Sequence, residues 1–167
     1  MPVLKILNDY TNADAPEKLI DYVVRKAIFS DGFAVDLNHA AEQIHAVKSF
    51  WCETGGRQMV HFILAFDGYE NVSLSNDEII RIAEIFCGLF YGRFQIVYGV
   101  HFDSWNIHIH FAMNNVSYID GKRYLSNRYD NLVLAGSIES ITGRTVILRQ
   151  HRTITRKQIG DAKRWQI

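Results

Sequence analysis

Apolar positions along the chain follow two spacings, one typical of strands and one typical of helices. Apolar runs at residues 2–8 and 59–66 predict two strands, and the β-rich runs 93–103 and 106–118 predict two more. Residues 17–28 and 38–52 have helical spacing. Ser75, three positions before Glu78, forms a capping-box pattern that predicts a helix reaching about residue 90.

The C-terminal part continues the same alternation of elements. Asp120-Gly121 predicts a hairpin turn into residues 122–125, followed by a helix from residue 126 or 127 to about 140 and a strand at 145–149. The order predicts an α/β fold, an α+β sandwich, whose central, mostly antiparallel sheet of about five strands is covered by helices. We expect one domain over residues 1–150 and a basic helical extension over 151–167, which could begin a further region of a longer protein.

Composition limits the classes of protein to which this chain can belong. The chain has 167 residues, 48% of them hydrophobic, which is enough for one sizeable core. We expect no membrane insertion and a cytoplasmic location, since no apolar run approaches about 18 residues and the N-terminus lacks the pattern of a secretory signal. Cys52 and Cys87 form no CxxC motif, so we expect buried free thiols rather than a disulfide or a zinc knuckle.

Charge is unevenly distributed although the net charge is zero. From Ile141 onward seven basic residues face one acid, which gives +6, and the rest of the chain carries 11 − 17 = −6. A basic tail of this kind could follow a phosphate backbone, and a solvated helix face explains it equally well.

The stretch VHFDSWNIHIHFAMN at residues 100–114 holds three of the seven histidines. If Ser104 and Trp105 form a two-residue turn, His101 lies opposite His108, and His110 lies one step along the same face of the ribbon. Three imidazoles then converge on one point, where they could bind a divalent metal and leave positions open for water or substrate. Asp103 falls on the same face and could orient a ligand or a water.

With these residues in view, the chain resembles the relaxase, or mobilisation-nuclease, domain of the HUH endonuclease superfamily, whose members nick plasmid or conjugative-element DNA for transfer. The resemblance covers about residues 1–140 and rests on LIDYVVRKA, TGGRQMVHFILAF, HFDSWNIHIHFAMNN and DGKRYLSN, in the family's order. Where many members have a further histidine, this chain has Asn106, and where many have serine after the HF strand it has Ala65.

The resemblance implies an HUH-type fold and a set of roles. His101, His108 and His110 would be metal ligands, Asp103 the carboxylate beside them, and Tyr22 the nucleophile. The reaction would be metal-dependent, strand-specific nicking of single-stranded or hairpin origin-of-transfer DNA through a 5′-phosphotyrosyl intermediate, with later rejoining. Accessory relaxosome proteins and a type IV secretion coupling protein are the further partners it implies.

The metal and the activation of the phenol stay open. Mn²⁺ or Mg²⁺ is expected from the family, while imidazole ligands also suit Ni²⁺, Co²⁺ or Zn²⁺. A tyrosine phenol in water has a pKa of about 10, so the nucleophile needs help from the metal, Asp103 or His61. From the residues alone His61 is a hydrogen-bonded core histidine, and Tyr10 is the second candidate nucleophile.

Several polar and aromatic residues are candidate DNA contacts. Arg57 follows a Gly-Gly pair that would let phosphate approach closely, and Trp105 at the expected hairpin tip could stack on a base. The motif asparagine and the cations after the hairpin complete the set, which is Asn114, Lys122, Arg123 and Arg128. Packing, helix termination and ordinary surface charge are the competing explanations.

Two other functions compete with nicking. A non-catalytic DNA-binding module would use the histidines for a structural metal and Tyr22 for packing. A small-molecule metalloenzyme could also use three histidines, but cupin-like sites need glycine-punctuated strands and a glutamate soon after HxH, and histidine-triad hydrolases need a third alternate histidine.

Overall fold

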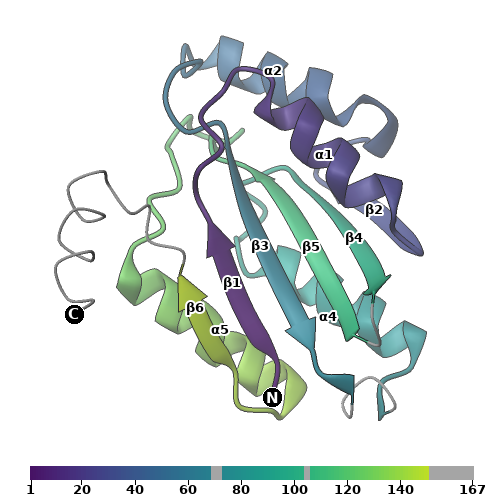
Figure 1. Ribbon diagram of the computed structural model, residues 1–167. Coiled ribbons are helices and arrows are strands. Elements are labelled where there is room, and N and C mark those ends of the chain that lie inside the picture. The colour runs from purple at the N-terminus through teal and green to yellow at the C-terminus, as the bar shows by residue number, and fades with distance from the viewer. Residues whose placement is uncertain (69–72, 104–105, 151–167) are drawn as a thin grey trace, which may run out of the picture.

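The computed structural model describes residues 1–68, 73–103 and 106–150, which form one six-stranded sheet with helices on both faces (Figure 1). The strands are β1 (Val3–Leu7), β2 (Phe29–Phe33), β3 (Met59–Phe66), β4 (Ile96–Asp103), β5 (Asn106–Asn114) and β6 (Ile147–Gln150). The helices are α1 (Ala15–Arg25), α2 (Ala40–Phe50), α4 (Asn76–Gly88) and α5 (Arg128–Thr142), with a short 3₁₀ helix, η1, at Leu37–His39. The strand order is β2-β4-β5-β3-β1-β6, antiparallel throughout except for the parallel pair β1 and β6.

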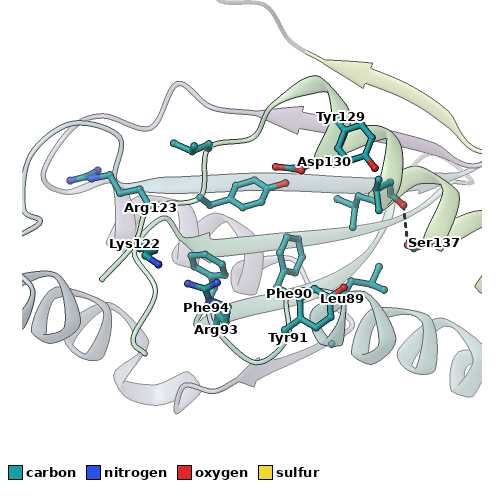
Figure 2. Close-up of a pocket in the computed structure, with 15 residues that line it drawn as sticks. Leu89, Phe90, Tyr91, Arg93, Phe94, Lys122, Arg123, Tyr129, Asp130 and Ser137 are labelled. Carbon is teal, nitrogen blue, oxygen red and sulfur yellow. Dashed lines mark hydrogen bonds between the residues drawn. The ribbon is translucent and has the colours of Figure 1, made fainter. Parts of the chain in front are cut away.

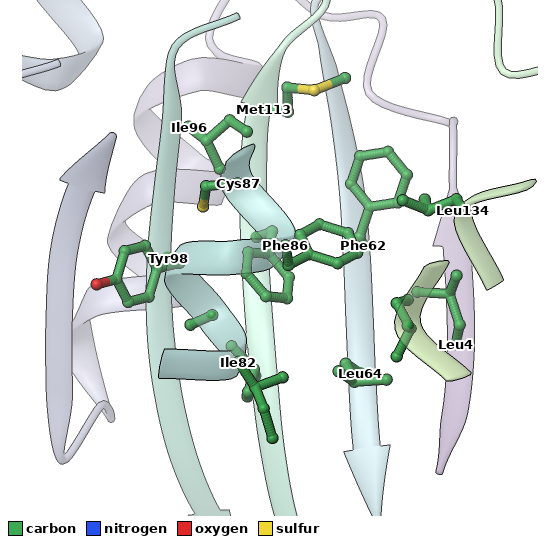
Figure 3. Packing of buried hydrophobic residues seen from close by; sticks show 14 of the residues in the cluster. Leu4, Phe62, Leu64, Ile82, Phe86, Cys87, Ile96, Tyr98, Met113 and Leu134 are labelled. Carbon is green, nitrogen blue, oxygen red and sulfur yellow. The ribbon is translucent and has the colours of Figure 1, made fainter. Parts of the chain in front are cut away.

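The two faces of the sheet carry cores of different size. Helices α4 and α5 cover one face, where a large cluster includes Phe62, Phe86 and Phe111 (Figure 3). The rings of Phe86 and Phe111 stack with centroids 4.0 Å apart, which ties α4 to the central strand β5. Helices α1 and α2 cover the other face with a smaller apolar cluster. This second face therefore has room for polar chemistry.

Alternation along β5 decides which side chains reach each face. Ile109 and Phe111 belong to the large core, whereas Ala112 belongs to the cluster under α1 and α2. Because neighbouring residues of a strand point to opposite faces, His108 and His110 lie on the face of Ala112. The hydrophobic pattern thus fixes the histidines on the side of α1.

A glycine lets α1 approach this face closely. A Cβ at Gly99 on β4 would lie 2.3 Å from the carbonyl oxygen of Val23, too close for any side chain to fit there. Gly99 is also the cross-strand partner of His110. The C-terminal turn of α1 therefore sits directly on the strand beside the histidine, a contact that any larger residue would prevent.

Most elements predicted from the sequence are confirmed, including the α+β class and the capping box, in which Ser75 and Glu78 bond to each other's backbone N–H. The sheet has six strands instead of about five, because β2 (FSDGF) lies at the edge of the sheet and lacks an apolar run. The hairpin after residue 120 forms only an isolated bridge between Val116 and Arg123, not a strand. The expected extension at 151–167 lies outside the described residues.

The cysteine prediction is half right. Both thiols are free, and Cys87 is buried among the large core, where burial raises its pKa. Cys52 is exposed, because α2 ends at Phe50 and Cys52 turns away with a left-handed φ of 56°. In the part of the chain described, no helix combines the length and the apolar character that crossing a bilayer requires.

Candidate active site

The β4–β5 ribbon holds its histidines in the register predicted from the sequence. His101 pairs with His108, and Gly99 pairs with His110. The ring centroids of His101 and His110 are 4.4 Å apart, and those of His108 and His110 are 6.1 Å apart. The three imidazoles therefore gather on one patch of the sheet, as the alternation requires.

A fourth histidine joins them from the neighbouring strand β3. His61 is 2% exposed, and its Nε2 lies 3.0 Å from Nδ1 of His110. Its other nitrogen, Nδ1, lies 2.9 Å from the hydroxyl of Tyr10. Sequence reasoning expected a hydrogen-bonded core histidine here, which is correct, but the partner is one of the three clustered histidines.

Tyr22 on α1 covers the cluster from above. Its ring centroid is 5.3 Å from that of His110, 5.9 Å from that of His61 and 5.9 Å from that of His101. Its side chain is nonetheless half exposed, at 51%. The phenol thus touches the histidines on one side and is open to solvent on the other.

The end of α1 is tied directly to the ribbon. Nε2 of His101 donates to the carbonyl oxygen of Val23 at 2.6 Å. That carbonyl lies in the last turn of the helix, where backbone oxygens lack helical partners. Together with the contact at Gly99, this bond fixes the height of the neighbouring Tyr22 over the sheet.

Burial keeps two of the rings neutral. Desolvation, helped by the nearby His101, lowers the pKa of His61 to about 4. Desolvation and the neighbouring histidines, with a smaller contribution from Lys5, lower the pKa of His110 to about 3. Burial also raises the pKa of Tyr10, with Tyr22 and Asp9 adding to it. Near neutral pH His61 and His110 are therefore neutral imidazoles, and the phenol of Tyr10 beside His61 is neutral as well.

Neutral imidazoles are the form that binds divalent metals, so the donor chemistry of the patch fits a metal ion. The ring orientations do not yet form a ligand set. Within residues 1–68, 73–103 and 106–150, no three histidine, cysteine or acidic side chains are already grouped to hold an ion. The donor atom Nε2 of His101 is committed to Val23, so this ring must turn before that nitrogen can coordinate.

Other expected site residues lie away from the cluster and bond internally. Arg57 donates through Nε to Oδ1 of Asn115 at 3.0 Å and through Nη2 to the carbonyl oxygen of Tyr124. Asn114 is fully buried and donates to Oε1 of Gln95 at 3.0 Å. In the structure both side chains hold backbone segments together.

The cations after residue 120 differ in exposure. Arg123 pairs with Glu53 at 2.7 Å and donates to the carbonyl oxygen of Gly55 at 2.7 Å, so it closes the loop before β3. Lys122 is 78% exposed beside Asp120, and Arg128 is exposed at the start of α5. Trp105 and the side chain of Asp103 lie outside the described part of the chain.

A separate cavity of about 640 Å³ lies on the opposite side of the sheet, between the end of α4 and the start of α5 (Figure 2). Its wall is mostly aromatic and aliphatic, and Lys122 and Arg123 lie at its rim. These two cations therefore do not join the histidines. Size alone does not mark a reactive site, and the clustered histidines with Tyr22 lie on the other face of the sheet.

Two residues of the site carry signals that sequence reasoning did not use. Lys5 is a lysine within the apolar strand β1, and it pairs with Ile63, which in turn pairs with His110. Gly99 is a glycine within a strand, a position that often marks the close approach of another backbone. Both signals were visible in the sequence, but neither indicates which partner the fold will bring.

Comparisons with known proteins identify a family through a family model and a shared fold through solved structures. A family model described as relaxase, MobA/VirD2-like, nuclease domain matches residues 22–142, well over half of the 167 residues. A MobM relaxase domain (MOBV, Mob_Pre) bound to 26-nucleotide pMV158 oriT DNA is 14% identical, with a TM-score of 0.61 and 93% of each chain covered. No curated protein sequence matches.

A second solved structure has the same fold. It comes from work on the molecular basis of vancomycin resistance transfer in Staphylococcus aureus. It is 11% identical, with a TM-score of 0.52, and the alignment covers 75% of this chain and 76% of that one. At such low identity the likeness extends to the fold and not to individual residues.

Proposed function

The chain belongs to the relaxase family, as a MobA/VirD2-like nuclease domain, and from this premise we propose that it nicks one strand of origin-of-transfer DNA with Tyr22 as the nucleophile. The substrate is single-stranded or hairpin DNA of a mobile element, and the product is a protein–DNA ester that can later be rejoined. Accessory relaxosome proteins and a type IV coupling protein are further partners of such a role.

The single observation that carries this proposal is the placement of Tyr22. Its ring contacts three histidines, yet half of the side chain is open to solvent. A packing tyrosine has no need of such exposure, whereas a nucleophile must meet a phosphodiester entering from solution. The two α1 contacts, through Val23 and Gly99, hold the phenol in reach of the cluster.

The proposed step is balanced without any co-reactant. The phenol oxygen of Tyr22 forms a bond to phosphorus as the bond from phosphorus to the 3′ oxygen breaks. The phenol gives up one proton and the 3′ oxygen gains one, so the products are a 5′-phosphotyrosyl ester and a free 3′-hydroxyl. The ester conserves the energy of the bond, and attack by a 3′-hydroxyl reverses the step.

The family generally uses a divalent metal, and here His101, His108 and His110 would hold it. When bound, the ion would withdraw charge from the non-bridging oxygens of the phosphate. The residues of this chain contribute position: β4 and β5 present the rings, and α1 presents the phenol. Asp103 stays a proposed partner of the same site.

The exposed cations Lys122 and Arg128 are proposed to contact phosphates away from the scissile bond, and Trp105 to stack on a base. Arg57, Asn114 and Arg123 already bond within the protein, so in our proposal they shape the surface that DNA follows. Replacing one phosphate-binding cation with alanine should reduce the salt dependence of single-strand binding by about 0.7 in the log–log slope.

The test is a cleavage assay on labelled single-stranded origin DNA with Mn²⁺ or Mg²⁺, read on a denaturing gel that retains covalent protein–DNA product. Wild type should form the adduct, EDTA should prevent it, and Tyr22→Phe should abolish it while DNA binding persists. Tyr129→Phe, exposed on α5, serves as the matched control and should cleave normally.

The same assay separates the alternatives. If Tyr22→Phe still forms the adduct and Tyr10→Phe does not, Tyr10 is the nucleophile. If wild type binds the DNA but forms no adduct with any metal, a non-catalytic DNA-binding module is the better description. A small-molecule metalloenzyme would not bind the DNA.

A further inference from the structure

Two consecutive hydrogen bonds link Tyr10, His61 and His110, and the position of the proton in one bond constrains the other. Tyr10 is linked to Nδ1 of His61 at 2.9 Å, and Nε2 of His61 is linked to Nδ1 of His110 at 3.0 Å. His61 is 2% exposed and His110 is 4% exposed, so water cannot easily replace either partner. A neutral imidazole has one N–H donor and one acceptor nitrogen, so the two bonds of His61 are not independent.

With both imidazoles neutral, only two arrangements of protons satisfy these two hydrogen bonds. In the first, the Tyr10 hydroxyl donates to His61, His61 donates to His110, and His110 carries its own proton on Nε2. In the second, His110 donates from Nδ1 to His61, and His61 donates from Nδ1 to the oxygen of Tyr10. The second arrangement alone leaves the Nε2 lone pair of His110 free to coordinate.

We propose that His61 and Tyr10 are positioning residues for the metal ligand His110, holding it in the tautomer and the orientation that coordinate through Nε2. This inference rests on the proposed function, because it assumes that His110 is a ligand. In metal sites a ligating imidazole commonly donates its other N–H to a fixed acceptor, and the loss of that acceptor weakens metal binding by about 10–100-fold. Here the acceptor is another imidazole, and Tyr10 fixes the tautomer of that imidazole in turn.

The geometry supports positioning over simple packing. The rings of His61 and His110 are tilted by 30° with centroids 5.2 Å apart, while Tyr10 meets His61 edge-on at 69°. The two polar bonds of His61 use its two different ring nitrogens, so both polar atoms of the ring are committed to partners. Two elements, the segment before α1 and strand β3, together hold one ligand on strand β5.

The experiment measures Mn²⁺ affinity of the full chain by isothermal titration calorimetry, without DNA and without turnover. His61→Phe removes the acceptor and should weaken binding about 10–100-fold. His61→Gln keeps an acceptor oxygen and should recover most of that loss. Tyr10→Phe should weaken binding by a smaller factor, of the order of 10-fold, since it frees the tautomer of His61 without removing the acceptor.

The control is His45→Gln, a half-exposed histidine on α2 that pairs with Glu17, which should bind Mn²⁺ as wild type does. Nitrogen-15 NMR of the imidazoles with diamagnetic Zn²⁺ gives a second readout, in which wild type should show His110 protonated at Nδ1. This second measurement does not depend on how well His61→Phe folds, because it uses wild type.

The possible results separate this inference from the proposed function. If His110→Ala loses Mn²⁺ but His61→Phe and His61→Gln both bind as tightly as wild type, the positioning role is overturned and the nuclease site stands. A bound His110 with its proton on Nε2 would overturn it equally. If wild type and His110→Ala bind Mn²⁺ with the same weak affinity, both proposals fail.

Discussion

Replacing Gly99 with alanine tests how α1 is held against the sheet. The new Cβ would lie 2.3 Å from the carbonyl oxygen of Val23, 3.1 Å from Cγ1 of Val23 and 3.2 Å from Cβ of Ala27. Two of these neighbours are a backbone oxygen of α1 and the Cβ of Ala27 just after the helix, which cannot turn away as the end of a long side chain would. The helix itself must move.

The distances give the size of that movement and its cost. Ordinary contact begins at about 3.4 Å, so α1 must retreat by about 1.1 Å (3.4 − 2.3) at Val23. Overpacking of this kind costs about 1–3 kcal/mol of unfolding free energy, partly offset by about 0.4–1 kcal/mol from the stiffer unfolded chain. The bond from His101 to Val23 would stretch with the same movement.

Activity should suffer more than stability. A displacement of about 1 Å at a reacting group can cost 100-fold in rate, and Tyr22 is the residue next to Val23. We therefore expect single-turnover cleavage of single-stranded origin DNA to fall by about 100-fold in Gly99→Ala, with DNA binding retained. Thermal unfolding followed by circular dichroism should show a midpoint lowered by about 2–4 °C for each kcal/mol lost.

The matched control is Gly136→Ala on α5, where nothing lies within 4 Å of the added Cβ. It should cleave normally and gain about 0.8–1 kcal/mol, because alanine favours a helix over glycine by that amount. Normal stability together with normal cleavage in Gly99→Ala would refute the close approach of α1. A destabilised Gly99→Ala that cleaves normally would show that this contact does not position Tyr22.

Three further predictions concern stability. Lys48 is 1% exposed, and burial, with a smaller effect of a nearby arginine, lowers its pKa from 10.5 to about 8. Between these two pKa values the unfolded chain holds more protons than the folded chain, so the stability of wild type relative to Lys48→Met should rise by up to about 3 kcal/mol as pH rises through this window. Urea unfolding measures this difference, and free energies of unfolding that change equally with pH in both proteins would contradict it. Gly121→Ala should lose at least about 1–3 kcal/mol in the same measurement, because its φ is +69° and its Cβ would lie 2.7 Å from the Trp51 ring, and an unchanged urea midpoint would argue against that packing. Ser75→Ala should lose about 1 kcal/mol through its capping box with Glu78, and a thermal midpoint equal to that of wild type would rule this out.

Local sequence determined the ribbon and the face of its histidines. A hairpin pairs residues that are close along the chain, and its alternation has a period of two, so the pairing of His101 with His108 follows from their spacing once a two-residue turn is assumed between the strands. The capping box at Ser75 is equally local. The α+β class followed from the order of such elements, because each one has a face that must be buried.

Contacts between distant segments could not be predicted in this way. The bond between His61 and His110 joins residues on two strands whose pairing depends on the whole sheet, and a histidine within an apolar strand looks the same whether it packs or supports a ligand. Strand β2 has polar residues and forms only because β4 offers it an edge. These features exist only once the strand order is set.

The partners of polar side chains could not be predicted from the sequence either. Arg57 and Asn114 carry the donors and acceptors that DNA would attract, but the fold brings backbone and side-chain partners within 3.0 Å and uses them first. A sequence gives the chemistry of a side chain but not its nearest partner. The tertiary structure alone decided that a glycine on β4 would let α1 descend until Tyr22 met the histidines, because that approach depends on the absence of one Cβ.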